Sequence, residues 1–121
     1  MAGSAGLRLL EQVRSFVAYG WCQGADARDA HGRSVEPWDE RATSWSVLGA
    51  LVAVLEREAA TTGEVPLEQL AAALYAIADV IHVDSLESWN DSFGRSQRDV
   101  LDALDRAVTA YGVAFPLSTQ V

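Results

Sequence analysis

Three short segments of the chain each set a tryptophan beside polar side chains and small residues. They are Gly20-Trp21-Cys22-Gln23-Gly24, Trp45-Ser46-Val47-Leu48-Gly49-Ala50 and Trp89-Asn90-Asp91. Tryptophan is large and seldom fully buried, and its indole N–H usually needs a hydrogen-bond partner. Because three of the four tryptophans share such neighbours, we expect one polar pocket that binds a small, partly aromatic ligand. Its predicted lining is Trp21, Gln23, Trp45, Ser46, Trp89 and Asn90.

Two side chains near the third segment are candidates for catalytic proton transfer. Asp91 lies close to Trp89, and partial desolvation beside an indole would raise the pKa of a carboxyl group toward neutrality. His82 precedes the same segment and carries the side chain that titrates nearest to physiological pH. A structural role is the alternative for both. Asn90-Asp91 would then form an Asx-turn over a buried Trp89, and His82 would be a hydrogen-bonded, partly buried imidazole.

Ser46 has three interpretations, of which the simplest is a helical hydroxyl bonded to a backbone carbonyl. The second is a polar contact within the pocket. The third, a serine nucleophile, is disfavoured because the chain has no Gly-x-Ser-x-Gly elbow and no obvious base beside Ser46. Gly49, three residues further on, predicts a close approach by another element.

Neither a metal nor a cofactor is predicted. Cys22 is the single cysteine, which excludes an intrachain disulfide, and the chain has no CxxC or zinc-type Cys/His spacing. His31 and His82 are the two histidines.

The elements that would position these residues are all helical. Apolar residues recur at helical spacing in four runs, which begin near Leu7, Pro37, Pro66 and Ser96 and end near residues 20, 60, 81 and 112. A one-turn helix is expected to begin near Ser85. We therefore predict an all-α, compact single-domain bundle over residues 1–112, with a C-terminal tail at 113–121. Two long loops, residues 21–36 and 82–95, should bring their tryptophans together at one end.

The third run, residues 66–81, has the widest apolar stripe and is predicted to be the central helix. The fourth begins with Ser96-Gln97-Arg98-Asp99, which resembles a capping box with aspartate at its last position. Gly20 and Gly112 are expected to end the first and fourth helices.

Charge and composition exclude some partners. The net charge of −8 over 121 residues opposes binding to phosphate backbones, so no nucleic-acid partner is expected. All nine basic residues are arginine, which is typical of a GC-rich genome. The alternative is that arginine is kept for bidentate contacts to anions.

No apolar run is long enough for a membrane span and no signal peptide is apparent, so a cytoplasmic protein is predicted. A homodimer is left open.

The ordered set of motifs resembles a known family. Gly20-Trp21-x-Gln23-Gly24, Asp29, Gly32, Trp45-Ser46-x-x-Gly49-Ala50, Trp89-Asn90-Asp91 and Val100-Leu101-x-x-Leu104-Asp105-Arg106-Ala107 are similar to domain of unknown function 6197. This family is found mainly in actinobacteria and their phages, and the resemblance covers roughly residues 7–110. The family usually has cysteine where this chain has Ser46, so no thiol role is carried over to that position. The resemblance implies no established activity.

Three classes of function follow. The leading prediction is a binding or accessory protein with a Trp-lined pocket, in actinobacterial secondary metabolism. The alternative is a small cofactor-independent enzyme, such as a cyclase, isomerase or hydrolase, that uses Asp91 or His82. The third is a protein-interaction module whose exposed tryptophans bind a partner.

Overall fold

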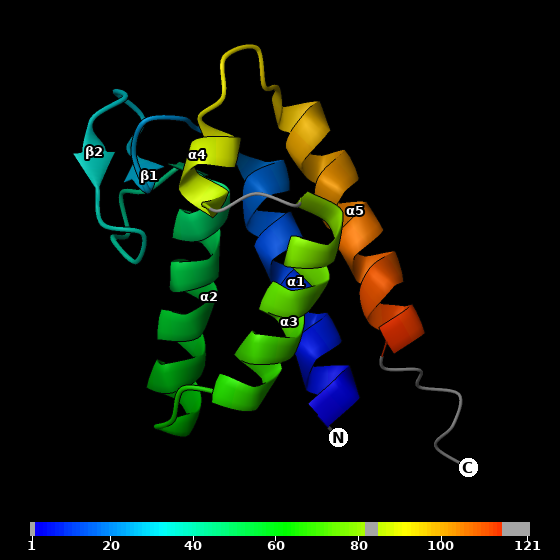
Figure 1. Cartoon of the computed structure of the whole chain (residues 1–121). Helices are drawn as coiled ribbons and strands as arrows, with labels where there is room; N and C mark the ends of the chain where they lie inside the picture. The colour runs from blue at the N-terminus through cyan, green and yellow to red at the C-terminus, as the bar shows by residue number, and fades with distance from the viewer. Residues whose placement is uncertain (1, 82–84, 115–121) are drawn as a thin grey trace.

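Five helices and three very short strands make up the part of the chain that the structure describes. The structure is a computed structural model that describes residues 2–81 and 85–114. The elements are α1 (Ala2–Tyr19), β1 (Ala27–Arg28), β2 (Ser34–Val35), β3 (Ser44–Trp45), α2 (Val47–Thr62), α3 (Leu67–Ile81), α4 (Leu86–Asn90) and α5 (Gln97–Ala114). Four long helices and one short helix agree with the prediction (Figure 1). The fold is mostly helical rather than all-α, because a small sheet lies beside the bundle.

The central helix is α1, not α3 as predicted. Helix α1 contacts α2, α3 and α5 as well as β3, and in Figure 1 it runs behind α3 between α2 and α5. Its Leu10, Val13 and Val17 are almost completely buried. Helix α3 buries only one edge of its apolar stripe, and its Leu67 and Leu74 are exposed. The wide apolar stripe of α3 therefore did not indicate the most buried helix, which is α1.

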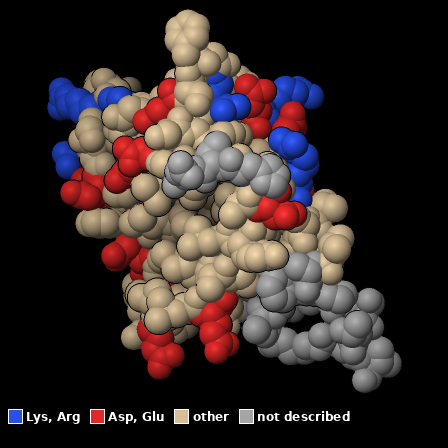
Figure 2. Space-filling view, in the orientation of Figure 1, with Lys and Arg blue, Asp and Glu red and all other residues tan. Residues whose placement is uncertain are grey.

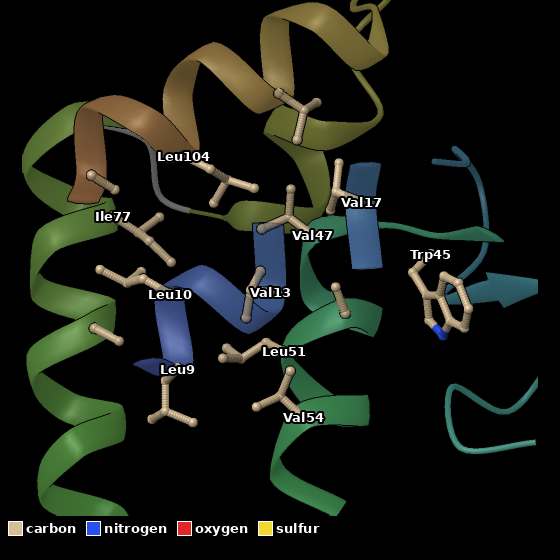
Figure 3. Packing of buried hydrophobic residues seen from close by; sticks show 14 of the residues in the cluster. Leu9, Leu10, Val13, Val17, Trp45, Val47, Leu51, Val54, Ile77 and Leu104 are labelled. Carbon is tan, nitrogen blue, oxygen red and sulfur yellow. The ribbon is translucent and has the colours of Figure 1, made fainter. Parts of the chain in front are cut away.

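The core is formed where α1 meets the other long helices. Leu10 and Val13 of α1 lie between Ile77 of α3 and Leu51 of α2 (Figure 3). Each aliphatic side chain of this kind contributes about 1.5–3 kcal/mol when it is fully buried. Trp45 lies at the edge of the same cluster, away from α3, and its exposed fraction is 7%.

The segment before α2 is extended, which corrects the predicted helix start at Pro37. Strand β1 pairs antiparallel with both β2 and β3, in the order β2-β1-β3. The Trp45 N–H donates to the Gly20 carbonyl at 2.9 Å, and Thr43 N–H donates to the Arg28 carbonyl at 2.8 Å. These long-range bonds hold residues 43–45 in strand geometry, so α2 begins only at Val47. The predicted loop 21–36 likewise contains β1 and β2.

Local capping sets several other helix ends as predicted. Ser96 Oγ accepts from Asp99 N–H at 3.1 Å, and Asp99 Oδ2 accepts from Ser96 N–H at 2.9 Å, which confirms the capping box. Ser85 caps the short helix α4, and α1 ends before Gly20. The predicted stop at Gly112 is wrong, since α5 continues to Ala114.

Surface charge is mixed on the face seen in Figure 2. Arginines lie among carboxylates toward the upper part of that face, and acidic side chains alone mark its lower edge. Within residues 2–81 and 85–114, none of the helices has the length and apolarity that crossing a bilayer requires.

Candidate functional site

The buried amide of Asn90 joins the three tryptophan segments. Its Oδ1 accepts from the indole Nε1 of Trp21 at 2.8 Å and from the backbone N–H of Val47 at 3.1 Å. Its Nδ2 donates to the carbonyl of Cys22 at 3.1 Å and to Asp91 Oδ1 at 2.9 Å. Asn90 is completely buried. All of the hydrogen-bonding capacity that an amide normally uses is thus taken up by the protein itself.

Gln23 fastens the first segment to the end of α4. Its Nε2 donates to the backbone carbonyls of Asn90 at 2.9 Å and Ser92 at 3.1 Å. Its own backbone carbonyl accepts from the guanidinium of Arg28, at 3.0 Å from Nη2. The Gly24 N–H donates to Asp91 Oδ1 at 3.0 Å. The two predicted loops therefore meet at one end of the bundle, as expected. We call this contact region, residues 20–24 with 89–92, the Asn90 junction.

The second segment reaches the junction through the first turn of α2. Ser46 is the N-cap of α2, where its Oγ accepts from Gly49 N–H at 3.0 Å. It is buried, with an exposed fraction of 2%. A Cβ atom on Gly49 would overlap the backbone carbonyl of Asp26, which confirms the predicted close approach. Ser46 thus accepts a backbone bond rather than donating one.

The three predicted tryptophans lie in one neighbourhood but in different surroundings. Trp21 is half-buried, and its backbone forms a bridge with Trp45. Trp89 is half-buried under the guanidinium of Arg95, whose Cζ is 4.1 Å from the ring centroid. Arg95 Nε also donates to the Trp89 carbonyl at 3.0 Å. Of the three, Trp45 lines the two cavities described below, whereas Trp21 and Trp89 line neither of them.

The two predicted proton carriers have different outcomes. Asp91 is exposed and ends α4 as its C-cap residue, and its Oδ1 takes the two hydrogen bonds already described. His82 lies outside the described residues. The buried thiol of Cys22 lies 3.6 Å from the carbonyl of Ala25, and burial raises the pKa of this thiol. No cluster of His, Cys, Asp and Glu suited to a metal ion occurs in the described part of the chain.

A cleft opens on the other side of Trp45, between α1, α2 and the segment 37–42. One hollow, the α1 cavity, has a volume of about 380 Å³ and is lined by Gln12, Ser15, Phe16, Tyr19, Ala42, Trp45 and Arg57. A second, the loop cavity, has a volume of about 430 Å³ and is lined by Phe16, Pro37, Trp38, Asp39, Glu40, Ala42, Trp45, Ala53, Glu56, Arg57 and Ala60. They share Phe16, Ala42, Trp45 and Arg57, and together we call them the Trp45 cleft.

Aromatic contacts fix the walls of this cleft. Trp45 meets Phe16 edge-to-face with ring centroids 4.8 Å apart, and Tyr19 at 6.1 Å. The Trp45 indole Nε1 donates to the Pro37 carbonyl at 3.0 Å, which holds the segment 37–42 against the ring. The guanidinium of Arg57 lies over Phe16, with Cζ 4.9 Å from the ring centroid.

The loop cavity has an acidic rim, and the α1 cavity does not. Asp39, Glu40 and Glu56 line the loop cavity. Arg41 donates to Asp39 from its side chain and backbone, and these bonds lower the pKa of the Asp39 carboxyl to about 2. No carboxylate lines the α1 cavity.

Sequence reasoning identified Trp45 but missed most of the cleft. The predicted residues Trp21, Gln23, Ser46, Trp89 and Asn90 line neither of its cavities. The missed residues from α1 are Gln12, Ser15, Phe16 and Tyr19. Gln12, Phe16 and Tyr19 recur at intervals of four and three and so share one helical face. That spacing could have indicated a second face of α1, although the more regular apolar stripe of the same helix makes it hard to recognise.

Comparison with known proteins identifies the family alone. The model of a family of unknown function, DUF6197, matches residues 3–110. Neither a search of curated proteins nor a search of solved structures found a match. The chain belongs to the DUF6197 family.

Proposed function

We propose that the protein binds a small, partly aromatic ligand in the Trp45 cleft. The observation that carries the proposal is the α1 cavity, where three aromatic rings, Phe16, Tyr19 and Trp45, line an open hollow of about 380 Å³. Small-molecule pockets are typically about 300–1,000 Å³, mostly apolar, with a few polar groups that fix orientation. Gln12, Ser15 and Arg57 are the polar groups here.

The Asn90 junction has a supporting role in this proposal. Its amides are engaged by the protein's own groups, and it holds the Trp45 backbone through the neighbouring Gly20 and Cys22. Ligand contact at the Asn90 amide would require breaking those bonds, which is costly for a buried group. Proton transfer by Asp91 is not included, because Asp91 lines neither cavity of the cleft. A role in actinobacterial secondary metabolism stays a hypothesis about the ligand's origin.

The test is a titration followed at the indole N–H of Trp45 by two-dimensional NMR. Indole, quinoline and benzoate serve as a panel of planar probes. We expect at least one of them to shift the Trp45 resonance together with amides of α1 near Phe16. If none of the panel shifts Trp45 at millimolar concentration, the proposal is wrong.

A matched pair of variants localises the binding. Ser15→Phe fills the mouth of the α1 cavity, while Thr109→Phe places the same ring on α5, outside both cavities of the cleft. Both hydroxyls donate to the carbonyl four residues earlier, Ser15 at 3.0 Å and Thr109 at 3.2 Å, so the helical change is equivalent. Ser15→Phe should abolish the probe shifts and Thr109→Phe should preserve them.

A second candidate is a protein-interaction surface. It is favoured by Trp38 and Tyr19 at the cleft, with exposed fractions of 54% and 76%. Exposed aromatic residues of this kind often carry much of the binding energy in protein interfaces. Self-association in sedimentation equilibrium that Trp38→Ala abolishes would favour this candidate. A monomer at all concentrations would count against a second copy of the chain as the partner.

A further inference from the structure

Arg57 is an exposed arginine that lines both cavities of the cleft and has no ion-pair partner among the described residues. No carboxylate among residues 2–81 and 85–114 forms an ion pair with its guanidinium; the ion pairs found there join Arg14 to Asp105 and Arg41 to Asp39. Its position over the Phe16 ring orients the planar group beside the aromatic walls. Guanidinium groups bind carboxylates through two parallel hydrogen bonds, so an anion at this point would complete the pairing.

Gln12 supplies a second unsatisfied group in the same cavity. Its Oε1 is buried and has no hydrogen-bond partner in the described part of the chain, although Gln12 lines the α1 cavity. Buried polar atoms are nearly always hydrogen-bonded, and an exception calls for an explanation. Because the terminal torsion of glutamine is soft, a rotation of the amide can turn this oxygen from its buried position toward a donor in the cavity.

We infer that the ligand of the Trp45 cleft is a planar aromatic acid that carries an N–H or O–H donor on or near its ring. Its ring would lie in the α1 cavity among Phe16, Tyr19 and Trp45, its carboxylate would meet Arg57, and its donor would meet Gln12 Oε1. This inference rests on the proposed function and assigns the chemistry of the ligand.

The acidic rim of the loop cavity makes the two ends of the cleft electrostatically different. Glu40 and Glu56 line the loop cavity, whereas the α1 cavity has none of the acidic side chains. Arg57 lines both cavities, but the carboxylates lie on the loop side alone, so an anionic group should approach Arg57 from the α1 side. A cationic ligand of the same shape would favour the loop cavity, which distinguishes the two by position.

Three probes of nearly equal shape test this assignment: indole-3-acetate, 1-methylindole-3-acetate and tryptamine. The first carries both the anion and the ring N–H, the second lacks the donor, and the third carries a cation. We expect indole-3-acetate to bind most tightly, with ring methylation weakening binding about 3- to 10-fold, as for the loss of one hydrogen bond. Tryptamine should bind about 10-fold or more weakly than indole-3-acetate.

Two variants assign each preference to its residue. Arg57→Gln should remove the preference for indole-3-acetate over tryptamine, and Arg98→Gln, the same charge change on an exposed part of α5, should retain it. Gln12→Leu should remove the preference for indole-3-acetate over its N-methyl form. Affinities come from the NMR titration, which also reports that each variant is folded.

The outcomes separate this inference from the proposed function. Equal binding of the three probes, or a preference for tryptamine, with Trp45 still shifted, would overturn the aromatic-acid assignment and leave the binding function standing. The aromatic-acid assignment would also be overturned if Arg57→Gln and Gln12→Leu kept the preferences for indole-3-acetate over the other two probes. If none of the probes shifts Trp45, both the assignment and the proposed function are wrong.

Discussion

The Asn90 junction and the Trp45 cleft use similar residue types in opposite ways. At the junction, the Asn90 amide makes four hydrogen bonds to the protein. Gln23, Ser46 and Asp91 are bonded to backbone groups. In the cleft, an amide oxygen is buried without a partner and a guanidinium lacks a carboxylate among the described residues. The two regions meet at Trp45, whose backbone bonds to Gly20 and Cys22 of the junction and whose ring lines the cleft.

This difference shows what a dense sequence motif can mean. Buried polar networks that are fully satisfied rigidify a fold and specify one arrangement. Groups that the fold leaves unsatisfied are free to bind something else. Tryptophan beside Asn, Gln and Ser predicted a binding pocket, whereas in the structure these polar groups hold the backbone in place. The groups without a protein partner come from ordinary helical positions: the buried Gln12 oxygen and the exposed Arg57 guanidinium.

The largest expected effect is from Asn90→Ala. The change would leave Trp21 Nε1, the Val47 N–H and the Cys22 carbonyl without their partner, and most of these groups are buried. Urea denaturation should show a loss of about 3–5 kcal/mol in the free energy of unfolding. The comparison variant Asp91→Ala removes one acceptor but leaves the other three bonds of Asn90 in place, so it should cost less, about 1–2 kcal/mol.

The same two variants, Asn90→Ala and Asp91→Ala, also test whether the junction is structural and the cleft is the ligand site. If Asn90→Ala retained its stability and instead lost probe binding, the junction would be the ligand site. The structural role assigned to its amide would then be wrong.

Gly49→Ala should have the next largest effect. The added methyl group would overlap the Asp26 carbonyl, which packs directly on this turn of α2. Overpacking of this kind costs about 1–3 kcal/mol, occasionally more. In Gly112→Ala, a Cβ on the α5 glycine meets nothing within 4 Å, so the helix should gain about 0.5–1 kcal/mol. Thermal denaturation should show a lower melting temperature for Gly49→Ala and a higher one for Gly112→Ala. A Gly49→Ala protein as stable as wild type would contradict the close packing of Asp26 on α2.

Features of the fold that depend on neighbours in sequence could be predicted. The Ser96–Asp99 capping box and the Ser85 cap are closed by bonds that span three residues. The start of α2 could not be predicted, because Pro37 and the acidic residues after it favour a helix locally. Bonds from Gly20 and Arg28, which lie 15 or more residues away, impose strand geometry on residues 43–45 instead.

The site was predictable to a smaller degree. Trp45 could be singled out because its size and its glycine neighbour are visible in the sequence. Gln12 and Arg57 could not, since an unsatisfied atom is a property of three-dimensional surroundings. The sequence pattern shows which polar residues lie near tryptophan, but not which of them already have partners.

A smaller effect of opposite sign is expected from Gln12→Leu in the absence of ligand. Leucine is similar in size and removes the buried oxygen that has no partner, so the free energy of unfolding should rise by about 1 kcal/mol. The control Gln97→Leu removes an amide that donates to the Val17 carbonyl at 2.8 Å, and it should destabilise the protein by a similar amount. Thermal denaturation measures both. A destabilised Gln12→Leu protein would mean that the amide has a structural role, and the contrast with the junction would fail.

The smallest effect concerns pH and the acidic rim of the cleft. Bonds from Arg41 lower the pKa of Asp39 to about 2, whereas an unfolded aspartate titrates near pH 3.9. Because the folded pKa is the lower one, the stabilisation from this carboxylate is present above about pH 4 and is lost as the pH falls toward 2. Asp39→Asn should therefore lower the melting temperature slightly at pH 7, and the difference from wild type should vanish near pH 2.

Since Asp39 lies two residues from Pro37, whose carbonyl accepts from the Trp45 indole, the Trp45 N–H resonance should move over the same pH range in wild type but not in Asp39→Asn. A Trp45 resonance that shifts equally in both proteins would show that the rim and the ring are not coupled, and that the cleft wall is held by the Pro37 contact alone.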